Sequence, residues 1–344
     1  MSAFAPTSPP AGVPKRSRHL LVLAYSPWDL VPVLCGVAHL AYVLTFFWFF
    51  DRLPWWGVAL AGAVYAVSVS WNINGISHNF IHNPYFRSGV LNRLFSLIES
   101  LALGFSQTFY DYVHTMHHVG NSDRPDEHGH TADPLSIYKH GEHGLPENAW
   151  TYTFLSFFRD DPQAIYKGIR KKNAGEARWG VFEIIAMVAF FVTLGILNWR
   201  FIACFVPCWY LGHCLSYLNG YFEHYAGNPD KPIAWGVSTY HRLYNWIWFN
   251  NGYHAEHHYR PRLHWTRMRE FHEAIEDQQQ AEGVRVIRPP HALGFLDRDL
   301  PTRAELAAAL HAPRSMSEVK PPEALAGGAE GDADATSAAM AGAR

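Results

Sequence analysis

The stretch from Asn250 to Trp265 carries the residues of this chain that are best suited to chemistry, and it reads NNGYHAEHHYRPRLHW. On an α-helix His254 and His258 are one turn apart and His257 falls between them, so all three imidazoles are expected to share a face about 100° wide. Imidazole nitrogen is a common ligand of transition metals. The stretch therefore predicts a metal-binding helix.

Two further histidine clusters lie upstream, HNFIH and HTMHH. A single pair of histidines one turn apart more often caps or lines a helix, but three such clusters in one chain favour a metal centre. One zinc ion takes about four ligands, so the imidazoles of three clusters indicate two metal ions. Spacing alone leaves zinc, copper, nickel and iron open. The predicted ligands from the three clusters are His78, His82, His114, His117, His118, His254, His257 and His258.

Composition narrows the class of protein. The chain has 344 residues, of which 15% are aromatic and 17% charged, and its formal net charge is -2. A nearly neutral, aromatic-rich chain argues against a nucleic-acid partner. The mean hydropathy is only -0.12, so a sizeable polar part must accompany any membrane spans.

Four apolar segments approach the length of ~20 residues that a bilayer requires. They lie near residues 30–50, 55–77, 182–198 and 201–221, and the short turns DRLP and NWR join them into two helical hairpins. Both hairpins return the chain to the side from which it entered. The basic residues between 167 and 178 place that side in the cytoplasm by the positive-inside rule, together with both termini and every histidine cluster.

The segment 91–105 also has apolar residues at helical spacing, with Arg93 and Glu99 on the other side. A crossing here would put the first and second histidine clusters on opposite faces of the membrane. A surface-lying or re-entrant helix is therefore predicted. Residues 1–19 are expected to form a disordered basic arm, 20–311 the membrane domain, and 312–344 a disordered tail.

The motifs HNFIH, HTMHH and GYHAEHH, in this order and separated by membrane hairpins, resemble those of the integral-membrane fatty acid desaturase and hydroxylase superfamily. The resemblance covers the chain from about His78 to Trp265. NGYFEHY, which contains His224, also looks like the additional motif N-Y-x-E-H-Y-G of membrane alkane hydroxylases. It departs from that motif because Gly220 is interposed and Ala226 stands where the family has glycine.

The resemblance implies an all-α integral membrane fold, with two hairpins as a stem and a cytosolic helical cap that holds a non-haem di-iron centre using O2 as co-substrate. It adds His224 to the eight predicted ligands, and no side chain beyond the ligands is assigned a catalytic role. Ligating imidazoles normally donate their other N–H to a neighbouring oxygen. Candidate partners for these hydrogen bonds are Asp111, Asn219, Glu223 and Glu256.

The implied reaction is O2-dependent oxidation of an unactivated C–H bond in a long acyl chain, with the cofactor supplying the chemistry. A fatty acid desaturase is the first choice. An alkane or fatty acid hydroxylase, and a fatty acid decarboxylase that yields a terminal alkene, are the alternatives. Aromatic candidates to line an acyl tunnel are Trp71, Phe105, Phe109, Tyr110, Tyr217 and Tyr221.

A membrane metal transporter or a zinc hydrolase is a hypothesis from another class. Zincins need HExxH, whereas Asn79 holds the glutamate position in HNFIH. Electrons must come from elsewhere, because the chain has no HPGG, no cysteine set for an iron–sulfur cluster and no GxGxxG. A separate donor of the ferredoxin, rubredoxin or cytochrome b5 type, with its reductase, is predicted as a partner beside the fatty acyl or alkane substrate and the bilayer.

Overall fold

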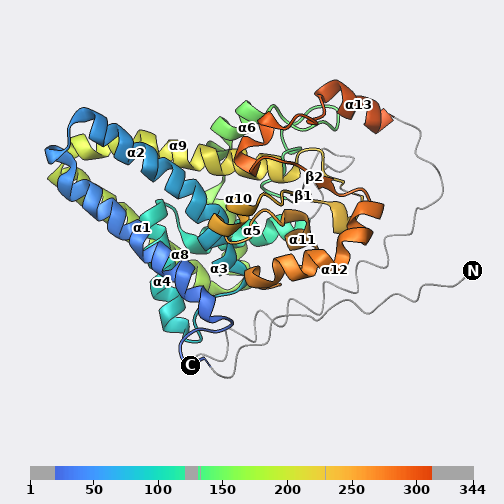
Figure 1. The fold of residues 1–344 in the computed structure, drawn as a ribbon. Helices are drawn as coiled ribbons and strands as arrows, with labels where there is room; N and C mark the ends of the chain where they lie inside the picture. The colour runs from blue at the N-terminus through green and yellow to red at the C-terminus, as the bar shows by residue number, and fades with distance from the viewer. Residues whose placement is uncertain (1–19, 121–130, 132, 229, 312–344) are drawn as a thin grey trace, which may run out of the picture.

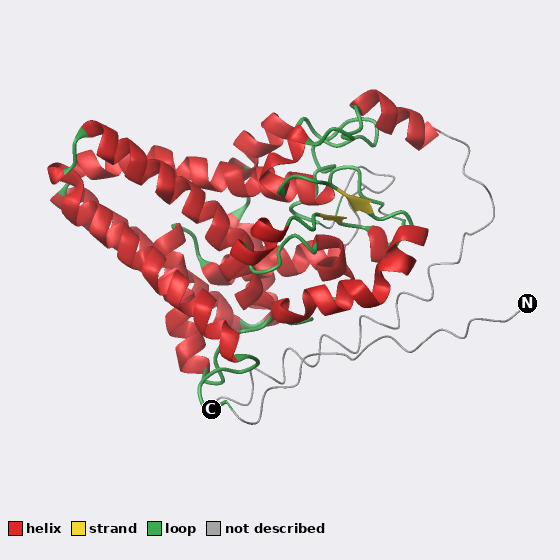
Figure 2. Cartoon of the chain, in the orientation of Figure 1, coloured by secondary structure: helices red, strands yellow, loops and turns green. Residues whose placement is uncertain are grey.

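The computed structural model describes residues 20–120, 131, 133–228 and 230–311, and this part of the chain is almost entirely helical (Figures 1 and 2). The two terminal segments predicted to be disordered, 1–19 and 312–344, lie outside the described residues. Long helices form one side of the molecule, and short helices and loops form the other (Figure 1).

Within the described residues, four helices are long and apolar enough to cross a membrane. They contain α1 (Leu30–Phe49), α2 (Trp55–Trp71), α8 (Ala174–Leu197) and α9 (Trp199–His224), and the helix that begins with α2 continues to His82. The prediction of four spans in two hairpins is therefore confirmed. The third begins at Ala174 rather than near residue 182, because Asn173 caps it through the amides of Gly175 and Glu176.

Both hairpins turn back at the same end of the molecule (Figure 1). Asp51, in the turn of the first hairpin, accepts a hydrogen bond from Asn198 in the turn of the second at 2.7 Å. Its other carboxylate oxygen lies 3.4 Å from the Arg200 guanidinium. The far ends of the four helices therefore also share one side, and the histidine clusters lie there.

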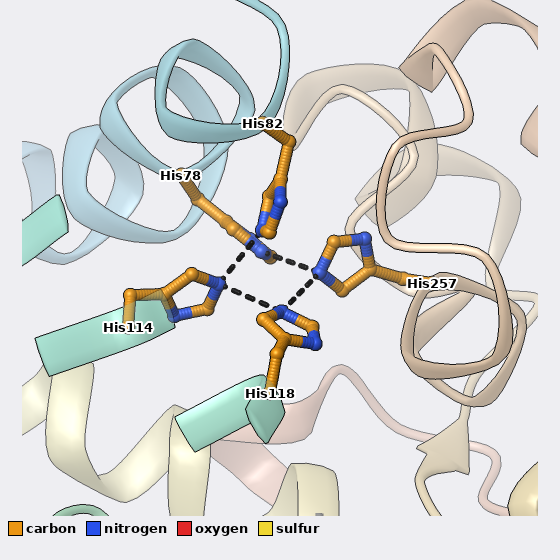
Figure 3. A group of neighbouring side chains, drawn as sticks. All are labelled: His78, His82, His114, His118 and His257. Atoms are coloured by element: carbon orange, nitrogen blue, oxygen red, sulfur yellow. Dashed lines mark hydrogen bonds between the residues drawn. The ribbon is translucent and has the colours of Figure 1, made fainter. Parts of the chain in front are cut away.

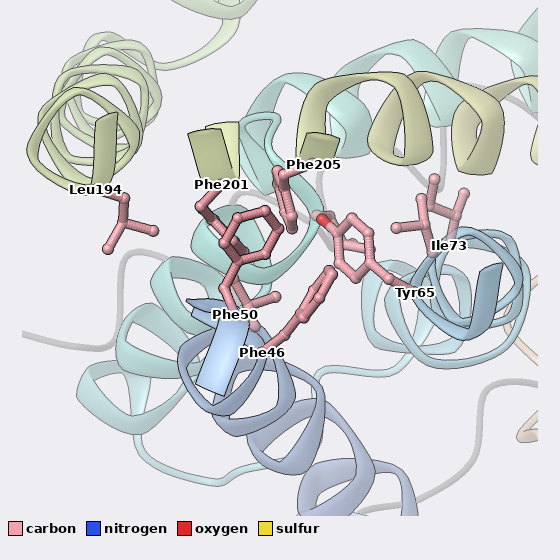
Figure 4. Close-up of a cluster of buried hydrophobic side chains, with 10 residues drawn as sticks. Phe46, Phe50, Tyr65, Ile73, Leu194, Phe201 and Phe205 are labelled. Carbon is pink, nitrogen blue, oxygen red and sulfur yellow. The ribbon is translucent and has the colours of Figure 1, made fainter. Parts of the chain in front are cut away.

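Aromatic side chains fill the stem between the hairpins (Figure 4). Phe46, Phe50, Phe201 and Phe205 form one buried cluster with Tyr65, and the rings of Tyr65 and Phe205 lie 4.4 Å apart.

Glycines let α2 and α9 pack closely, which is typical of helices in membranes. A Cβ at Gly62 would lie 2.5 Å from Cys208 Sγ. A Cβ at Gly212 would lie 2.6 Å from Val69 Cβ and 2.8 Å from the Ala66 carbonyl oxygen.

Helices α4 (Gly89–Leu103) and α5 (Gln107–Gly120) form a re-entrant hairpin beside the spans. The end of α4 lies about halfway along the stem, where Tyr65 Oη donates to the Ala102 carbonyl at 2.9 Å and Trp209 Nε1 to the Leu103 carbonyl at 2.8 Å. Backbone carbonyls at membrane depth need such partners because lipid offers none. Gly104 makes the turn with a φ of 72°. Of the two predicted forms of this segment, these contacts support the re-entrant one.

The polar side of α4 faces inward, a feature that the apolar spacing of the segment did not specify. Glu99 is completely buried, and its side chain lies against Gly36 of α1. Leu94 and Val90 are 51% and 69% exposed. The physical reason is that α4 packs between α1 and α8, so its polar groups find partners inside while lipid accepts the apolar ones.

The cap consists of short elements. A parallel pair of two-residue strands, β1 (Val237–Ser238) and β2 (Arg285–Val286), joins its middle to its C-terminal part. Asp29, at the start of α1, accepts hydrogen bonds from His264 at 2.9 Å and Trp265 at 3.0 Å and so fastens the cap to the stem. The helices of the cap are α6 (Ala149–Leu155), α7 (Pro162–Lys172), α10 (Arg242–Ile247), α11 (His254–Tyr259), α12 (Met268–Ala281) and α13 (Arg303–His311).

Candidate metal centre

Four elements carry the predicted ligands to one place. Helix α3 (His78–His82) continues α2 through a π-helical segment, Asn72–Ser77, which is a conformation often found at functional sites. Helix α5 carries the second cluster, the end of α9 carries His224, and α11 carries the third cluster.

Helix α5 is fixed at its start by Glu183 of α8, which is completely buried. One carboxylate oxygen of Glu183 accepts from Ser106 Oγ at 2.6 Å and from the Thr108 amide at 3.0 Å, and the other accepts from Ser96 Oγ. A carboxylate at this position accepts hydrogen bonds from free amides of the first turn, and its negative charge interacts favourably with the helix dipole.

The first histidine group draws on α3, α5 and α11 (Figure 3). Its five imidazoles each offer a nitrogen, and these nitrogens lie within 4.8 Å of one another. Neighbouring Nε2 atoms lie 2.9–3.0 Å apart around the group. The members are His78, His82, His114, His118 and His257.

The second histidine group consists of His117, His224, His254 and His258, whose nitrogens also lie within 4.8 Å of one another. All four side chains are buried. Nε2 of His224 lies 3.1 Å from that of His117 and 3.0 Å from that of His254. The two groups adjoin each other, because the rings of His118 and His258 are 4.4 Å apart.

The structure divides each HxxHH cluster between the two groups rather than presenting it on one face to one ion. His114 and His118 belong to the first group and His117 to the second. His254 and His258 belong to the second group, whereas His257 belongs to the first. A helix advances 100° per residue, so positions i and i+4 differ by about 40° while i+3 is turned about 60° to the other side.

Burial keeps these imidazoles neutral, which is the form that binds metal. Desolvation, and next the neighbouring histidines, lower the pKa of His114, His118, His254, His257 and His258 well below the ordinary value. Neither ring nitrogen of the buried His258 has a hydrogen-bond partner among the described residues. Closely spaced nitrogen lone pairs of this kind suit a cation, so the two groups fit a pair of metal ions.

Two imidazoles have their tautomer set by oxygen acceptors at Nδ1. Nδ1 of His78 lies 3.2 Å from the Asn74 carbonyl oxygen and 3.2 Å from Asn251 Oδ1, so it carries the proton. Nδ1 of His117 donates to Asp133 Oδ2 at 2.7 Å. In both residues Nε2 then presents its lone pair to its group.

Sequence reasoning missed Asp133 and Asn251. Asp133 lies beyond the second cluster without helical spacing, so no local pattern marks it. Asn251 stands in the same stretch as the third cluster, where a polar residue three positions before His254 was the available signal.

The four predicted hydrogen-bond partners have different surroundings. Glu223 Oε1 lies 3.7 Å from Nδ1 of His254 and accepts from Asn219 at 2.8 Å, so both residues adjoin the second group.

Glu256 and Asp111 bond elsewhere. Glu256 accepts from Ser238, Tyr240 and His272 at 2.7–2.8 Å, and Asp111 accepts from Thr115 at 3.2 Å.

Of the predicted tunnel aromatics, Tyr110 lies beside the first histidine group. Tyr110 stands between Phe105 and His114, with ring centroids 5.3 and 5.8 Å away. Trp71 lines a groove of about 490 Å³ on α2. Tyr221 instead belongs to a buried apolar cluster and donates to the Glu147 carbonyl at 2.7 Å.

Four candidate spans that carry two adjoining groups of buried imidazoles define a class of membrane metalloprotein. Residues 53–290 match the family model described as fatty acid desaturase. This match covers more than half of the chain, so the chain belongs to the fatty acid desaturase family and is an integral membrane protein.

Relatives agree with this assignment at low identity. The chain is 25% identical over 251 residues to a sphingolipid delta(4)-desaturase of Schizosaccharomyces pombe, a match that covers 69% of this chain and 66% of the relative. It is 25% identical over 197 residues to a sphingolipid delta(4)-desaturase DES1-like protein of Oryza sativa subsp. japonica, with 56% of each chain covered. A protein of the same description from Arabidopsis thaliana is 26% identical over 194 residues, with 54% of each chain covered. The matches therefore span between 54% and 66% of these relatives' own length.

Proposed function

We propose that this protein is an O2-dependent membrane desaturase that introduces a double bond into a long hydrocarbon chain of a lipid. The observation that carries the proposal is the pair of adjoining imidazole groups, five and four in number, beside membrane spans. Membership of the fatty acid desaturase family supports the reaction type. Residues 20–311 form the membrane domain of this proposal.

The two groups would hold two iron ions through Nε2 or Nδ1 of their nine histidines. When bound, such ions supply the activation of O2 and the removal of hydrogen from an unactivated C–H bond, which no side chain can do. The task of this chain's own residues is to hold the imidazoles neutral, to keep water away and to orient the chain of the substrate. The burial of the groups and the lowered imidazole pKa values support the first two roles.

An apolar groove on the outer face of α2 supports a substrate that enters from the bilayer. Val67, Trp71 and Trp248 line it, and the Trp71 indole donates to the Ile247 carbonyl at 2.8 Å. Lipid chains partition into the membrane and reach such a groove sideways. The relatives are named as sphingolipid desaturases. These names favour, as the substrate, a hydrocarbon chain that is part of a membrane lipid.

We further propose that electrons reach the metals from a separate donor of the ferredoxin, rubredoxin or cytochrome b5 type and its reductase. The excess of basic residues near residue 170 supports a cytoplasmic location of the cap and of the metal centre. A cytoplasmic centre would be accessible to a soluble or membrane-bound donor on that side.

The test is to express the protein in cells, supply isotopically labelled fatty acid and sphingoid base, and analyse the lipids by mass spectrometry. We expect a product lighter by two hydrogens, and we expect His257→Ala to abolish it together with iron binding. Only hydroxylated product would instead favour the hydroxylase that the NGYFEHY motif suggests. Zinc at one ion per chain, without iron uptake under anaerobic reconstitution, would contradict both.

A further inference from the structure

The side chain of Asn251 lies between the two histidine groups. We infer that Asn251 is a positioning residue that fixes the metal-binding form of His78 and links the first group to the second through Glu223. This inference rests on the metal centre proposed above and adds a residue that belongs to neither group. Asn251 is 8% exposed and Glu223 5% exposed, so water does not replace their hydrogen bonds readily.

The orientation of the Asn251 amide follows from its neighbours. Its Nδ2 lies 2.7 Å from Glu223 Oε1 and 3.0 Å from Tyr244 Oη. A carboxylate oxygen only accepts, so the NH2 side of the amide must face Glu223. The carbonyl oxygen Oδ1 consequently faces His78.

This orientation favours the same tautomer of His78 as the Asn74 carbonyl does. Nδ1 of His78 has two acceptors, Asn251 Oδ1 and the Asn74 carbonyl oxygen, each at 3.2 Å. A neutral imidazole carries one N–H, so Nδ1 holds it and Nε2 is left with a lone pair. Nε2 lies 2.9 Å from Nε2 of His257, inside the first group.

The other end of the amide reaches the second group. Glu223 Oε1, which accepts from Asn251, is 3.7 Å from Nδ1 of His254. The Asn219 amide holds the same oxygen from the opposite side at 2.8 Å. The side chains of His78, Asn251 and Glu223 are thus hydrogen-bonded in series, and Glu223 ends 3.7 Å from His254, beyond hydrogen-bond distance.

The backbone immediately before Asn251 is strained, and this strained turn sets the position of the Asn251 side chain. Phe249 and Asn250 adopt φ values of 50° and 62°, in the left-handed region that non-glycine residues rarely occupy. Such a turn persists only where its surroundings hold it.

Close contacts on both sides of the turn provide this support. A Cβ at Gly75 of the π-helical segment would lie 3.1 Å from the Phe249 ring. On the other side, Asn245 Oδ1 accepts from the Gly252 amide at 2.9 Å. The turn therefore presents Asn251 at a fixed position between the groups.

The first half of the inference is tested with Co²⁺ as the probe, titrated anaerobically into the full-length protein and followed by its visible absorption. A background of His224→Ala with His254→Ala leaves the first group alone. In it, Asn251→Leu should weaken Co²⁺ binding about 10- to 100-fold, the usual cost of losing a hydrogen bond to a ligating imidazole. Asn251→Asp should retain the affinity, because an oxygen still faces His78. Equal Co²⁺ affinity with and without Asn251→Leu in this background would overturn the proposed effect of Asn251 on His78.

The link to the second group is tested in a background of His78→Ala, His82→Ala and His114→Ala, which leaves only two histidines in the first group and all four in the second. Asn251→Leu removes the donor to Glu223 without adding a charge, so Glu223 loses one of the hydrogen bonds that hold it beside His254. Co²⁺ binding by the second group should therefore weaken, and an unchanged affinity would refute the link between the groups.

Two controls distinguish a failure of the proposed Asn251 role from a failure of the proposed metal centre. Asn92→Leu makes the same substitution at a half-buried amide whose side chain hydrogen-bonds the Phe86 backbone, and it should leave both affinities unchanged. If Asn251→Leu fails to fold, Asn251→Ala removes the same polar atoms and takes its place. Unsubstituted protein that binds fewer than two Co²⁺ ions would contradict the proposed metal centre itself, whereas two ions with no effect of Asn251 variants would contradict only this inference.

Discussion

Replacement of Glu183 tests whether the membrane span α8 controls the geometry of the second histidine cluster. The buried Glu183 carboxylate accepts from the Thr108 amide and from the hydroxyls of Ser96 and Ser106. A hydrogen bond to a charged group contributes about 1.5–3 kcal/mol, and each buried donor left without its partner costs about 1–3 kcal/mol. We therefore expect Glu183→Ala to lower the free energy of unfolding by about 3–5 kcal/mol. Glu183→Gln keeps one acceptor and should lose about half of that, because neutral hydrogen bonds are roughly half as strong.

The loss should extend to metal binding, since α5 supplies His114 and His118 to the first group and His117 to the second. The assay is unfolding in mixed micelles by circular dichroism, with bound metal measured on the same preparations. Glu176→Ala on the same helix is the matched control.

Glu176 pairs with Arg93 near the surface, where an ion pair contributes roughly 0–1 kcal/mol. If the Glu183→Ala protein loses no more stability or bound metal than the Glu176→Ala protein, Glu183 does not hold α5 in place.

Three further outcomes are expected. Gly212→Leu should abolish the folded protein, measured as monodisperse yield in detergent, because a side chain there meets the α2 backbone, whereas Gly212→Ala should reduce the yield less. Asp133→Ala should weaken the second metal about 10- to 100-fold in a Co²⁺ titration, since it frees Nδ1 of His117. The pKa of His272 is raised, because the hydrogen bond and charge of Glu256 outweigh the lowering effect of burial. This pair should therefore stabilise the cap fully below about pH 6.5 and lose its effect as pH rises through the raised pKa. His272→Gln should flatten that part of the stability profile measured by thermal unfolding.

The membrane spans and the re-entrant helix could be predicted from the sequence. Apolar length predicts α1, α2, α8 and α9 directly, because a bilayer sets a minimum length for each. Because the histidine clusters must share one side of the membrane, segment 91–105 is predicted not to cross the membrane. The face that α4 buries was beyond such reasoning, since burial of Glu99 depends on α1 and α8, which approach it from distant parts of the chain.

The sequence by itself determined which residues have the chemistry of metal ligands, and it predicted a site for two ions, because residue type and helical spacing are local properties. Only the tertiary structure decided how nine imidazoles divide into five and four, and which oxygens set their tautomers. Asn251 lies 173 positions from His78, and the acceptor of His117 is Asp133 on a loop without periodicity. Contacts of this kind arise from the packing of separate elements, and no spacing rule along the chain encodes them.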